Sequence, residues 1–210
     1  ITESIINNIL KKLNIKPKDV CCIGYHGQTI RHQPIKKFSI QIGNAHMLAE
    51  KTNIAVVADF RNRDIIAGGQ GAPLVPAFHQ QVFASQVRNR VIINIGGISN
   101  ITYLKTDHKL IGFDCGPGNL LLDYWIQRNK NKKYDNQGKW ASTGKIISNL
   151  LAEFMKEPFF RKKPPKSTGR DLFNSSWLET FNHKKHNPED IQRTLLELTA
   201  VSINQSIERY

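Results

Sequence analysis

Two adjacent glycines between β-branched apolar runs constrain the fold of this chain more than any other feature. Residues 91–95 form one such run and residues 101–104 form a second, and Gly96 and Gly97 follow directly after the first. Adjacent glycines allow the tight backbone turn that joins antiparallel strands. We therefore predict a β-hairpin here, with residues 110–113 as a third strand.

Short apolar runs and alternation predict further strands. Residues 20–24 and 54–58 are continuous apolar runs and are predicted to be buried strands. At residues 38–42, Phe38, Ile40 and Ile42 alternate with polar residues, which is typical of a half-buried strand. The glycine- and proline-rich residues 67–76 are predicted to form a loop.

Helices are predicted where an apolar stripe, a stop signal or a capping residue occurs, at residues 1–13, 45–51, 76–83, 119–127, 145–155, 173–181 and from 188 to the end of the chain. Asn187 is a suitable N-cap for the last of these, with Pro188 at the first helical position. Mixed strands and helices followed by a helical half predict the α/β class, with helices covering a sheet. A domain boundary is predicted at Asp59, so that residues 1–59 and 60–210 form separate parts.

Composition excludes several classes of protein. The chain has 210 residues, of which 40% are apolar and 22% are charged, as in ordinary globular domains. No run approaches the ~20 apolar residues of a membrane-spanning helix. The three cysteines include no CxxC pair, which argues against a disulfide framework or a zinc site. The first residue is Ile1 and no signal region follows it, so we expect a cytoplasmic protein or a piece of one.

The formal net charge of +13 suggests anionic partners, among which nucleic acid, anionic lipid and phosphorylated metabolites are candidates. A second explanation is codon bias, because 25 Ile, 20 Lys and 18 Asn together make up 63 of the 210 residues, as an AT-rich genome would produce. No basic stripe interleaved with aromatic residues is present. We therefore predict no nucleic-acid partner and no membrane partner.

Two glycine-rich segments are the strongest candidates for ligand binding. They read NIGGISN at residues 94–100 and GFDCGPGN at residues 112–119. Glycines after a strand let backbone N–H groups approach an anion such as phosphate. Neither segment is a dinucleotide-binding fingerprint or a P-loop. A hairpin turn that binds nothing explains the same glycines equally well.

Asp114 is the candidate catalytic carboxylate. It is predicted to end an apolar strand just before a turn and a helix, and ligands bind at the carboxyl ends of strands in α/β sheets. A carboxylate placed there can act as a general base. The alternative is that Asp114 caps the following helix.

Three further groups carry polar side chains beside predicted strands or turns. His26 lies between two glycines just past a strand, and Arg61, Arg63 and Asp64 follow another. Arginine is suited to clamp a carboxylate or phosphate. A structural histidine and a self-paired Arg–Asp cluster are the alternatives. Residues 166–171 hold two cations, and either bind an anionic substrate group or cap a helix through Ser167 or Thr168.

Taken together, six motifs closely resemble those of the bacterial anhydro-N-acetylmuramic acid kinases, in the same order and at similar spacing over nearly the whole chain. They are GYHGQTIRH (24–32), DFRNRD (59–64), AGGQGAPLVPAFH (67–79), NIGGISN (94–100), GFDCGPGN (112–119) and PKSTGR (165–170). The resemblance implies a two-lobed fold of the actin, sugar-kinase and Hsp70 type, with ATP and Mg²⁺ as cofactors. A homodimer would suit the family.

The resemblance also implies the reaction and the site. Water opens the 1,6-anhydro bridge of 1,6-anhydro-N-acetylmuramic acid, and the freed O6 receives the γ-phosphoryl group, giving N-acetylmuramate 6-phosphate in peptidoglycan recycling. Asp114 matches the residue to which the family assigns the general base. The remaining expected contacts are assigned by position and residue type: Asn94, Gly96, Gly97 and Gly116 for the ATP phosphates, and His26, Gln28, Arg61, Arg63 and Asp64 for the sugar substrate.

The sequence departs from the family in one respect. Members begin with a strand and a Gly-Thr-Ser-Leu-Asp-Gly type phosphate loop, and this motif does not occur here. We therefore expect an internal piece, truncated at both ends, that is inactive by itself. A catalytically dead binding or regulatory protein on the same scaffold is the alternative function.

Overall fold

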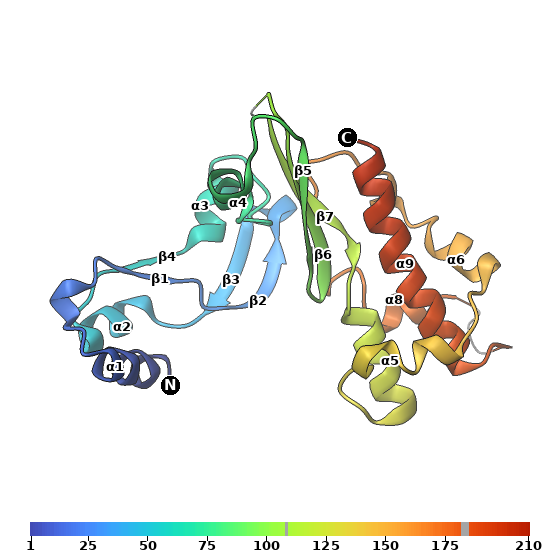
Figure 1. The fold of residues 1–210 in the computed structure, drawn as a ribbon. Coiled ribbons are helices and arrows are strands. Elements are labelled where there is room, and N and C mark those ends of the chain that lie inside the picture. The colour runs from blue at the N-terminus through green and yellow to red at the C-terminus, as the bar shows by residue number, and fades with distance from the viewer. Residues whose placement is uncertain (108, 182–184) are drawn as a thin grey trace. The chain divides into compact units, whose positions relative to one another are not determined.

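The computed structural model describes residues 1–107, 109–181 and 185–210 (Figure 1). They divide into two compact units, Ile1–Gly71 and Ala72–Tyr210. Helix α3 (Phe60–Ile66) belongs to the first unit, where the Asn62 side chain accepts a hydrogen bond of 2.8 Å from the Ser39 N–H. The division into units therefore lies further along the chain than the predicted boundary at Asp59, which stays a prediction about the lobes of the complete protein.

Helices α1 (Thr2–Leu13) and α2 (Ala45–Thr52) of the first unit begin and end close to where the sequence predicts, whereas no helix was predicted at α3. Helix α1 ends at Asn14, whose φ of 53° is left-handed, before Pro17. Helix α2 begins after Asn44, whose side chain accepts the Met47 N–H at 2.9 Å. Two short 3₁₀ turns, η1 (Pro17–Asp19) and η2 (Pro34–Lys36), complete the helical elements described in this unit.

The predicted buried strands of the first unit are shorter and more exposed than expected. Strands β1 (Ile23–Tyr25) and β4 (Val56–Ala58) pair in parallel, Ile23 with Val56 and Tyr25 with Ala58. Their side chains are half-buried or exposed, because within the described residues the pair has no third strand and α2 is the helix packed against β4. The prediction of buried strands at residues 20–24 and 54–58 was wrong in that respect.

The hairpin of β2 (Gln28–Gln33) and β3 (Phe38–Ile42) buries the opposite face from the one expected. Ser39 is only 3% exposed, whereas Ile40 is 44% and Ile42 is 54% exposed. Hydrogen bonds explain why Ser39 is on the covered face. The Ser39 N–H donates to the Asn62 side chain of α3, and the Ser39 hydroxyl accepts a hydrogen bond of 2.6 Å from the Gln41 side chain. Side-chain hydrogen bonds therefore determine which face of this strand is covered.

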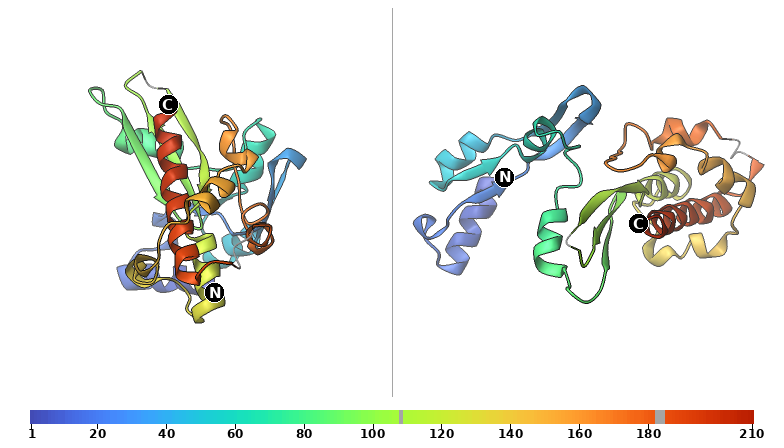
Figure 2. Two further views of the ribbon diagram at one scale, coloured as in Figure 1. Left: turned by 90° about the vertical axis from the view of Figure 1, so that its right-hand side faces the viewer. Right: turned by 90° about the horizontal axis from the view of Figure 1, so that it is seen from above.

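The second unit is built on the predicted hairpin and its third strand. Strands β5 (Arg90–Ile95), β6 (Ile98–Leu104) and β7 (Leu110–Pro117) form one antiparallel sheet in the order β5-β6-β7. Helix α9 (Pro188–Glu208) packs along one face, as the views in Figure 2 show. Helix α4 (Pro76–Phe83) packs against the same two strands, β6 and β7, that α9 contacts.

The largest core of the second unit lies among its helices. The shorter helical elements are α5 (Leu120–Lys130), η3 (Asn136–Gly138), η4 (Ala141–Thr143), α6 (Ser148–Phe154), α7 (Pro158–Arg161) and α8 (Ser175–Glu179). Six buried aromatic side chains from this region meet the apolar stripe of α9, namely Trp125, Phe154, Phe159, Phe160, Phe173 and Trp177. The stripe includes Ile191, Leu195 and Leu198, each at most 1% exposed, as the sequence predicted.

Two of these helices are shorter than predicted because neighbouring side chains bind the backbone before them. Helix α6 begins at Ser148, since Lys145 N–H donates to the Asp190 carboxylate and Ile147 N–H donates to the Thr194 hydroxyl. Helix α8 begins after Asn174, whose side chain accepts the Trp177 N–H at 2.9 Å. Asn187 is the N-cap residue of α9 as predicted, but its side chain makes no capping hydrogen bond.

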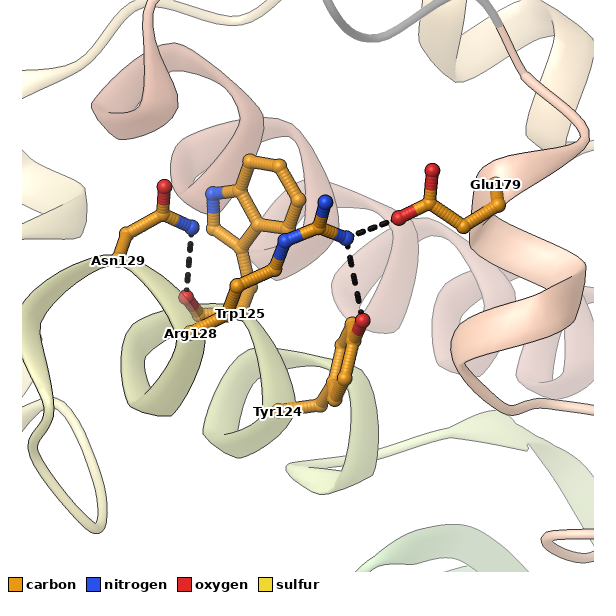
Figure 3. A network of polar contacts seen from close by, with 5 residues as sticks. All are labelled: Tyr124, Trp125, Arg128, Asn129 and Glu179. Carbon is orange, nitrogen blue, oxygen red and sulfur yellow. Dashed lines mark hydrogen bonds and ion pairs between the residues drawn. The ribbon is translucent and has the colours of Figure 1, made fainter.

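A polar network on α5 joins it to α8 (Figure 3). The Arg128 guanidinium pairs with the Glu179 carboxylate, donates to the Tyr124 hydroxyl at 3.2 Å and lies 5.7 Å from the centre of the Trp125 ring. On the same helix, the Asn129 amide donates to the Trp125 carbonyl at 2.8 Å.

The order of strands and helices confirms the mixed α/β class, and the principal core lies in the helical half.

Candidate active site

A row of polar side chains crosses the three-stranded sheet of the second unit. The register places Asn94 of β5 opposite Asn100 of β6, and Asn100 opposite Asp114 of β7. Residues that lie directly opposite each other in antiparallel strands project from the same face of the sheet. Asn94, Asn100 and Asp114 therefore share one face, and we call these three residues the polar row.

The polar row lies on the face opposite α9. Phe113 and Cys115, which flank Asp114 in β7, pack in one apolar cluster with Ile203 of α9, and successive strand residues point to opposite faces. The face of the polar row also carries Thr102, which hydrogen-bonds the His79 ring of α4 at 2.8 Å. Helix α9 therefore packs on one face of the sheet, and α4 covers part of the opposite face, from which Asp114 projects.

Asp114 is buried, with 4% of its surface exposed, and it is held by the chain segment 166–168. Its backbone N–H donates to the Lys166 carbonyl at 3.2 Å. One carboxylate oxygen, Oδ2, accepts the Thr168 N–H at 2.9 Å. These two hydrogen bonds fix the position of the Asp114 backbone and carboxylate against residues 166–168.

Two buried polar atoms close to Asp114 have no hydrogen-bond partner within the described part of the chain. They are Oδ1 of Asn100, which faces Asp114 across the sheet, and Oγ1 of Thr168, whose backbone N–H binds the carboxylate. Buried polar atoms in proteins are almost always hydrogen-bonded, by a ligand or water where protein groups do not serve. Their position on both sides of Asp114 favours a polar ligand at this point.

The local setting of Asp114 differs from the one predicted. Asp114 lies inside β7, which continues to Pro117, and the sheet is antiparallel, so the crevice at the ends of parallel strands does not apply. It does not cap α5 either, because the N-cap there is Asn119. Its neighbour Cys115 is not a competing nucleophile, since burial raises the pKa of its thiol to about 11.

The Gly96–Gly97 turn forms as predicted and contacts the start of α5. The carbonyl of Gly96 accepts the Asn119 N–H at 2.8 Å, and the carbonyl of Gly97 accepts the N–H groups of Gly118 and Leu120. The Gly96 N–H donates to Ile98. The Gly97 N–H is bound by no described residue and Gly97 is exposed, so Gly97 offers the donor that a phosphate oxygen needs.

Gly116 and Asn94, the other residues predicted to contact phosphate, lie outside the Gly96–Gly97 turn. Gly116 is buried with φ of 155°, and a Cβ atom there would lie 2.7 Å from the Phe160 ring, so packing alone requires glycine. The Asn94 side chain is exposed at the end of the polar row. Phosphate contact by either residue stays a prediction.

In the first unit, His26 and Arg61 are brought together. The Arg61 Nε–H donates to Nε2 of His26 at 2.9 Å, and Nδ1 of His26 lies 2.8 Å from the Gly27 carbonyl. The carbonyl requires a donor and the guanidinium requires an acceptor, so these contacts fit the tautomer of His26 that donates from Nδ1 and accepts at Nε2. Arg61 also donates to the Gly71 carbonyl, which ties the glycine-rich loop to α3.

The other predicted substrate residues of the first unit lie nearby in sequence but in different settings. Asp64 accepts the Gly71 N–H at 2.7 Å and so holds the same loop as Arg61. The Arg63 side chain is exposed and makes no hydrogen bond or ion pair with the described residues, although its backbone is bonded within α3. Gln28 is exposed at the first position of β2. Arg63 and Gln28 are thus available to a ligand, whereas Asp64 has a structural contact.

The described residues do not form a metal cage, since they bring no three His, Cys, Asp or Glu side chains together in a suitable group. Mg²⁺ that accompanies a nucleotide is typically held by phosphates, water and one or two carboxylates instead. Across the described ranges, no helix has the length and apolarity that crossing a bilayer demands.

The sequence matches one enzyme family along its whole length. The profile of a family described as anhydro-N-acetylmuramic acid kinase matches residues 1–210. The chain belongs to this kinase family. It is 51% identical over 205 residues to the anhydro-N-acetylmuramic acid kinase of Pseudomonas syringae pv. tomato, covering 97% of this chain and 56% of that protein. It is 53% identical over 209 residues to that of Shewanella oneidensis, covering 96% of this chain and 56% of that protein. The chain thus spans about half the length of the curated relatives it matches.

Sequence reasoning missed two features of this candidate site. It gave no role to Asn100, and it treated residues 166–171 as an anion site or a helix cap. Neither Ser167 nor Thr168 caps α8, whose N-cap is Asn174, and the Lys166 side chain is buried. The available signal was that both segments lie in motifs shared with the family, NIGGISN and PKSTGR.

Proposed function

We propose that the complete protein containing this chain is an ATP-dependent kinase that opens 1,6-anhydro-N-acetylmuramic acid with water and phosphorylates O6, giving N-acetylmuramate 6-phosphate. The observation that carries the proposal is the match of the whole chain to the kinase family. Relatives of about half identity bear the same enzyme name, and the six motifs lie along the matched region.

Asp114 serves as the general base in this mechanism. An acetal carbon is a weak electrophile and water is a weak nucleophile, so removal of a proton from water assists the attack on C1. As water bonds to C1, the bond from C1 to O6 breaks, and O6 takes the γ-phosphoryl group while ADP leaves. The water proton passes to Asp114 and then to solvent. Support comes from the buried carboxylate and the unpartnered atoms of Asn100 and Thr168 beside it.

The Gly96–Gly97 turn contacts the nucleotide phosphates. Negative charge on the transferring phosphoryl oxygens is stabilised by N–H donors and by Mg²⁺. The exposed Gly97 N–H supports this role, and Asn94, Gly96 and Gly116 belong to the same proposed region. We propose that Mg²⁺ arrives with ATP, where it would neutralise phosphate charge, and we assign it no ligand in this chain.

The first unit contributes the sugar-binding groups. The lactyl carboxylate of the substrate calls for a cation, and Arg63 is the better of the two candidates because it is exposed while Arg61 binds His26 and Gly71. His26 and Gln28 line the sugar site, and Asp64 holds the loop beside it. We infer a two-lobed fold of the sugar-kinase type for the complete protein, working in the cytoplasm where ATP is supplied, and a homodimer suits this family.

The test of this proposal uses the complete gene product that carries this chain. We expect ADP and sugar phosphate to appear together, in equal amounts, when it is mixed with ATP, Mg²⁺ and 1,6-anhydro-N-acetylmuramic acid. The 210-residue chain alone is expected to produce neither. A folded complete protein that yields no product would favour the catalytically dead scaffold, and ADP without sugar phosphate would point to another acceptor.

A further inference from the structure

Lys166 is an unusual buried cation beside the candidate base. Only 6% of its surface is exposed. Its ammonium group lies 4.5 Å from the centre of the Phe159 ring and 5.5 Å from that of Phe113, and it donates to the Phe159 carbonyl at 3.3 Å. No carboxylate in the described residues forms an ion pair with it. Burying a charge without a counter-ion is unfavourable for folding.

The same residue begins the segment that holds Asp114. The Lys166 carbonyl accepts the Asp114 N–H, and two residues later the Thr168 N–H reaches the Asp114 carboxylate. The ammonium lies against Phe113, which faces α9, whereas Asp114 projects from the other face of β7. Residues 166–168 therefore pass along the edge of β7. The Lys166 side chain packs on the face of β7 that lies toward α9, and the Thr168 N–H bonds to the Asp114 carboxylate on the opposite face.

From this arrangement we propose that Lys166 is a positioning residue for Asp114. Its side chain fixes the segment 166–168 in the pose that presents the Thr168 N–H to the carboxylate. The inference rests on the proposed function, because Asp114 needs positioning only if it acts as the base. Misplacement of a catalytic group by about 1 Å can lower turnover by roughly 10²-fold.

The charged and titratable groups around Lys166 come from three elements. Burial lowers the pKa of the Lys166 ammonium most, Cys115 and Asp114 of β7 oppose this change, and Arg209 after α9 and Lys162 after α7 add to it. Replacing Lys166 by methionine removes the buried charge but keeps an unbranched apolar side chain among the rings. Folding should therefore not be weakened. The hydrogen bond from the ammonium to the Phe159 carbonyl, which fixes residues 166–168 beside Asp114, is lost.

The experiment compares K166M with K163M in the complete gene product, since Lys163 is an exposed lysine three residues before Lys166. We expect K166M to lower kcat at least about 10-fold with KM changed less than about twofold. The acid limb of its kcat/KM profile should move to higher pH, because the carboxylate loses a hydrogen bond that favours its charged form. The melting temperature should stay unchanged or rise, and K163M should match the wild type throughout.

Two results would overturn the inference. One is a K166M protein with wild-type kcat and an unmoved acid limb. The other is a loss of activity that follows a fall in melting temperature, with the pH profile unchanged, which would mean a purely structural role. A second measurement is independent of activity: hydrogen exchange in the peptide covering residues 166–170 should speed up in K166M. An inactive wild type would instead count against the proposed function, and the exchange result would still test the positioning.

Discussion

At the scale of single residues, the setting of Asp114 depends on a contact between distant parts of the chain. The Thr168 N–H that binds its carboxylate lies 54 positions further along. The sequence identified Asp114 through its motif, but no local pattern shows which backbone group reaches it. The burial of Lys166 could not be predicted either, because a lysine in a polar, glycine-containing segment is expected to be exposed.

Cys115 provides a prediction about pH and stability. Burial raises the pKa of its thiol from 9.0 to about 11 in the folded protein. Above pH 9 the unfolded chain loses this proton while the folded chain keeps it, so folding stability falls between pH 9 and pH 11. We expect this one group to remove about 2 kcal/mol over that interval.

The measurement is denaturant unfolding of wild type and Cys115→Ala at pH 8 and pH 10.5. The variant should be less stable at pH 8, because a buried side chain is truncated, but its further loss on raising the pH should be smaller than that of the wild type. Equal losses in the two proteins would show that Cys115 does not titrate as described.

At the scale of elements, hairpin register decides which side chains share a face. A two-residue loop at Gly96 and Gly97 would place Asn94 opposite Ser99. The observed register places Asn94 opposite Asn100, so both amides join Asp114 on one face. Because a shift of one residue moves a side chain to the other face, the polar row could not be predicted from strand positions alone. Helices α1 and α9 were predictable because their apolar stripes and ends are local features.

Gly118 tests the junction between the hairpin and α5. A Cβ atom at Gly118 would lie 2.4 Å from the Gly96 carbonyl oxygen, which is too close for van der Waals contact. We expect Gly118→Ala to destabilise the protein by about 1–3 kcal/mol, because backbone would have to move. Gly169→Ala is the matched control, since no atom lies within 4 Å of its Cβ position. Thermal unfolding should show a lower midpoint for the first variant alone, and similar midpoints for both would refute the packing argument.

At the scale of the whole molecule, the sequence predicted the α/β class and the family, and the structure and comparisons confirm both. It did not predict that polar contacts of Ser39 would turn the apolar side chains of β3 outward, since alternation alone does not show which face is covered. Nor could it show that Arg61 and Asp64 bind Gly71, contacts that lie within the first compact unit together with α3. These contacts join separate segments, and periodicity carries no information about them.

The most direct test of the account is turnover by Asp114→Asn in the complete gene product. The amide keeps the shape of the carboxylate but cannot take a proton from water, so we predict that formation of ADP and sugar phosphate falls roughly 10²-fold or more together. Asp171→Asn is the control, because Asp171 is exposed in the same segment as Thr168 and should leave turnover unchanged. Near-normal turnover by a folded Asp114→Asn protein would contradict the assignment of Asp114 as the base.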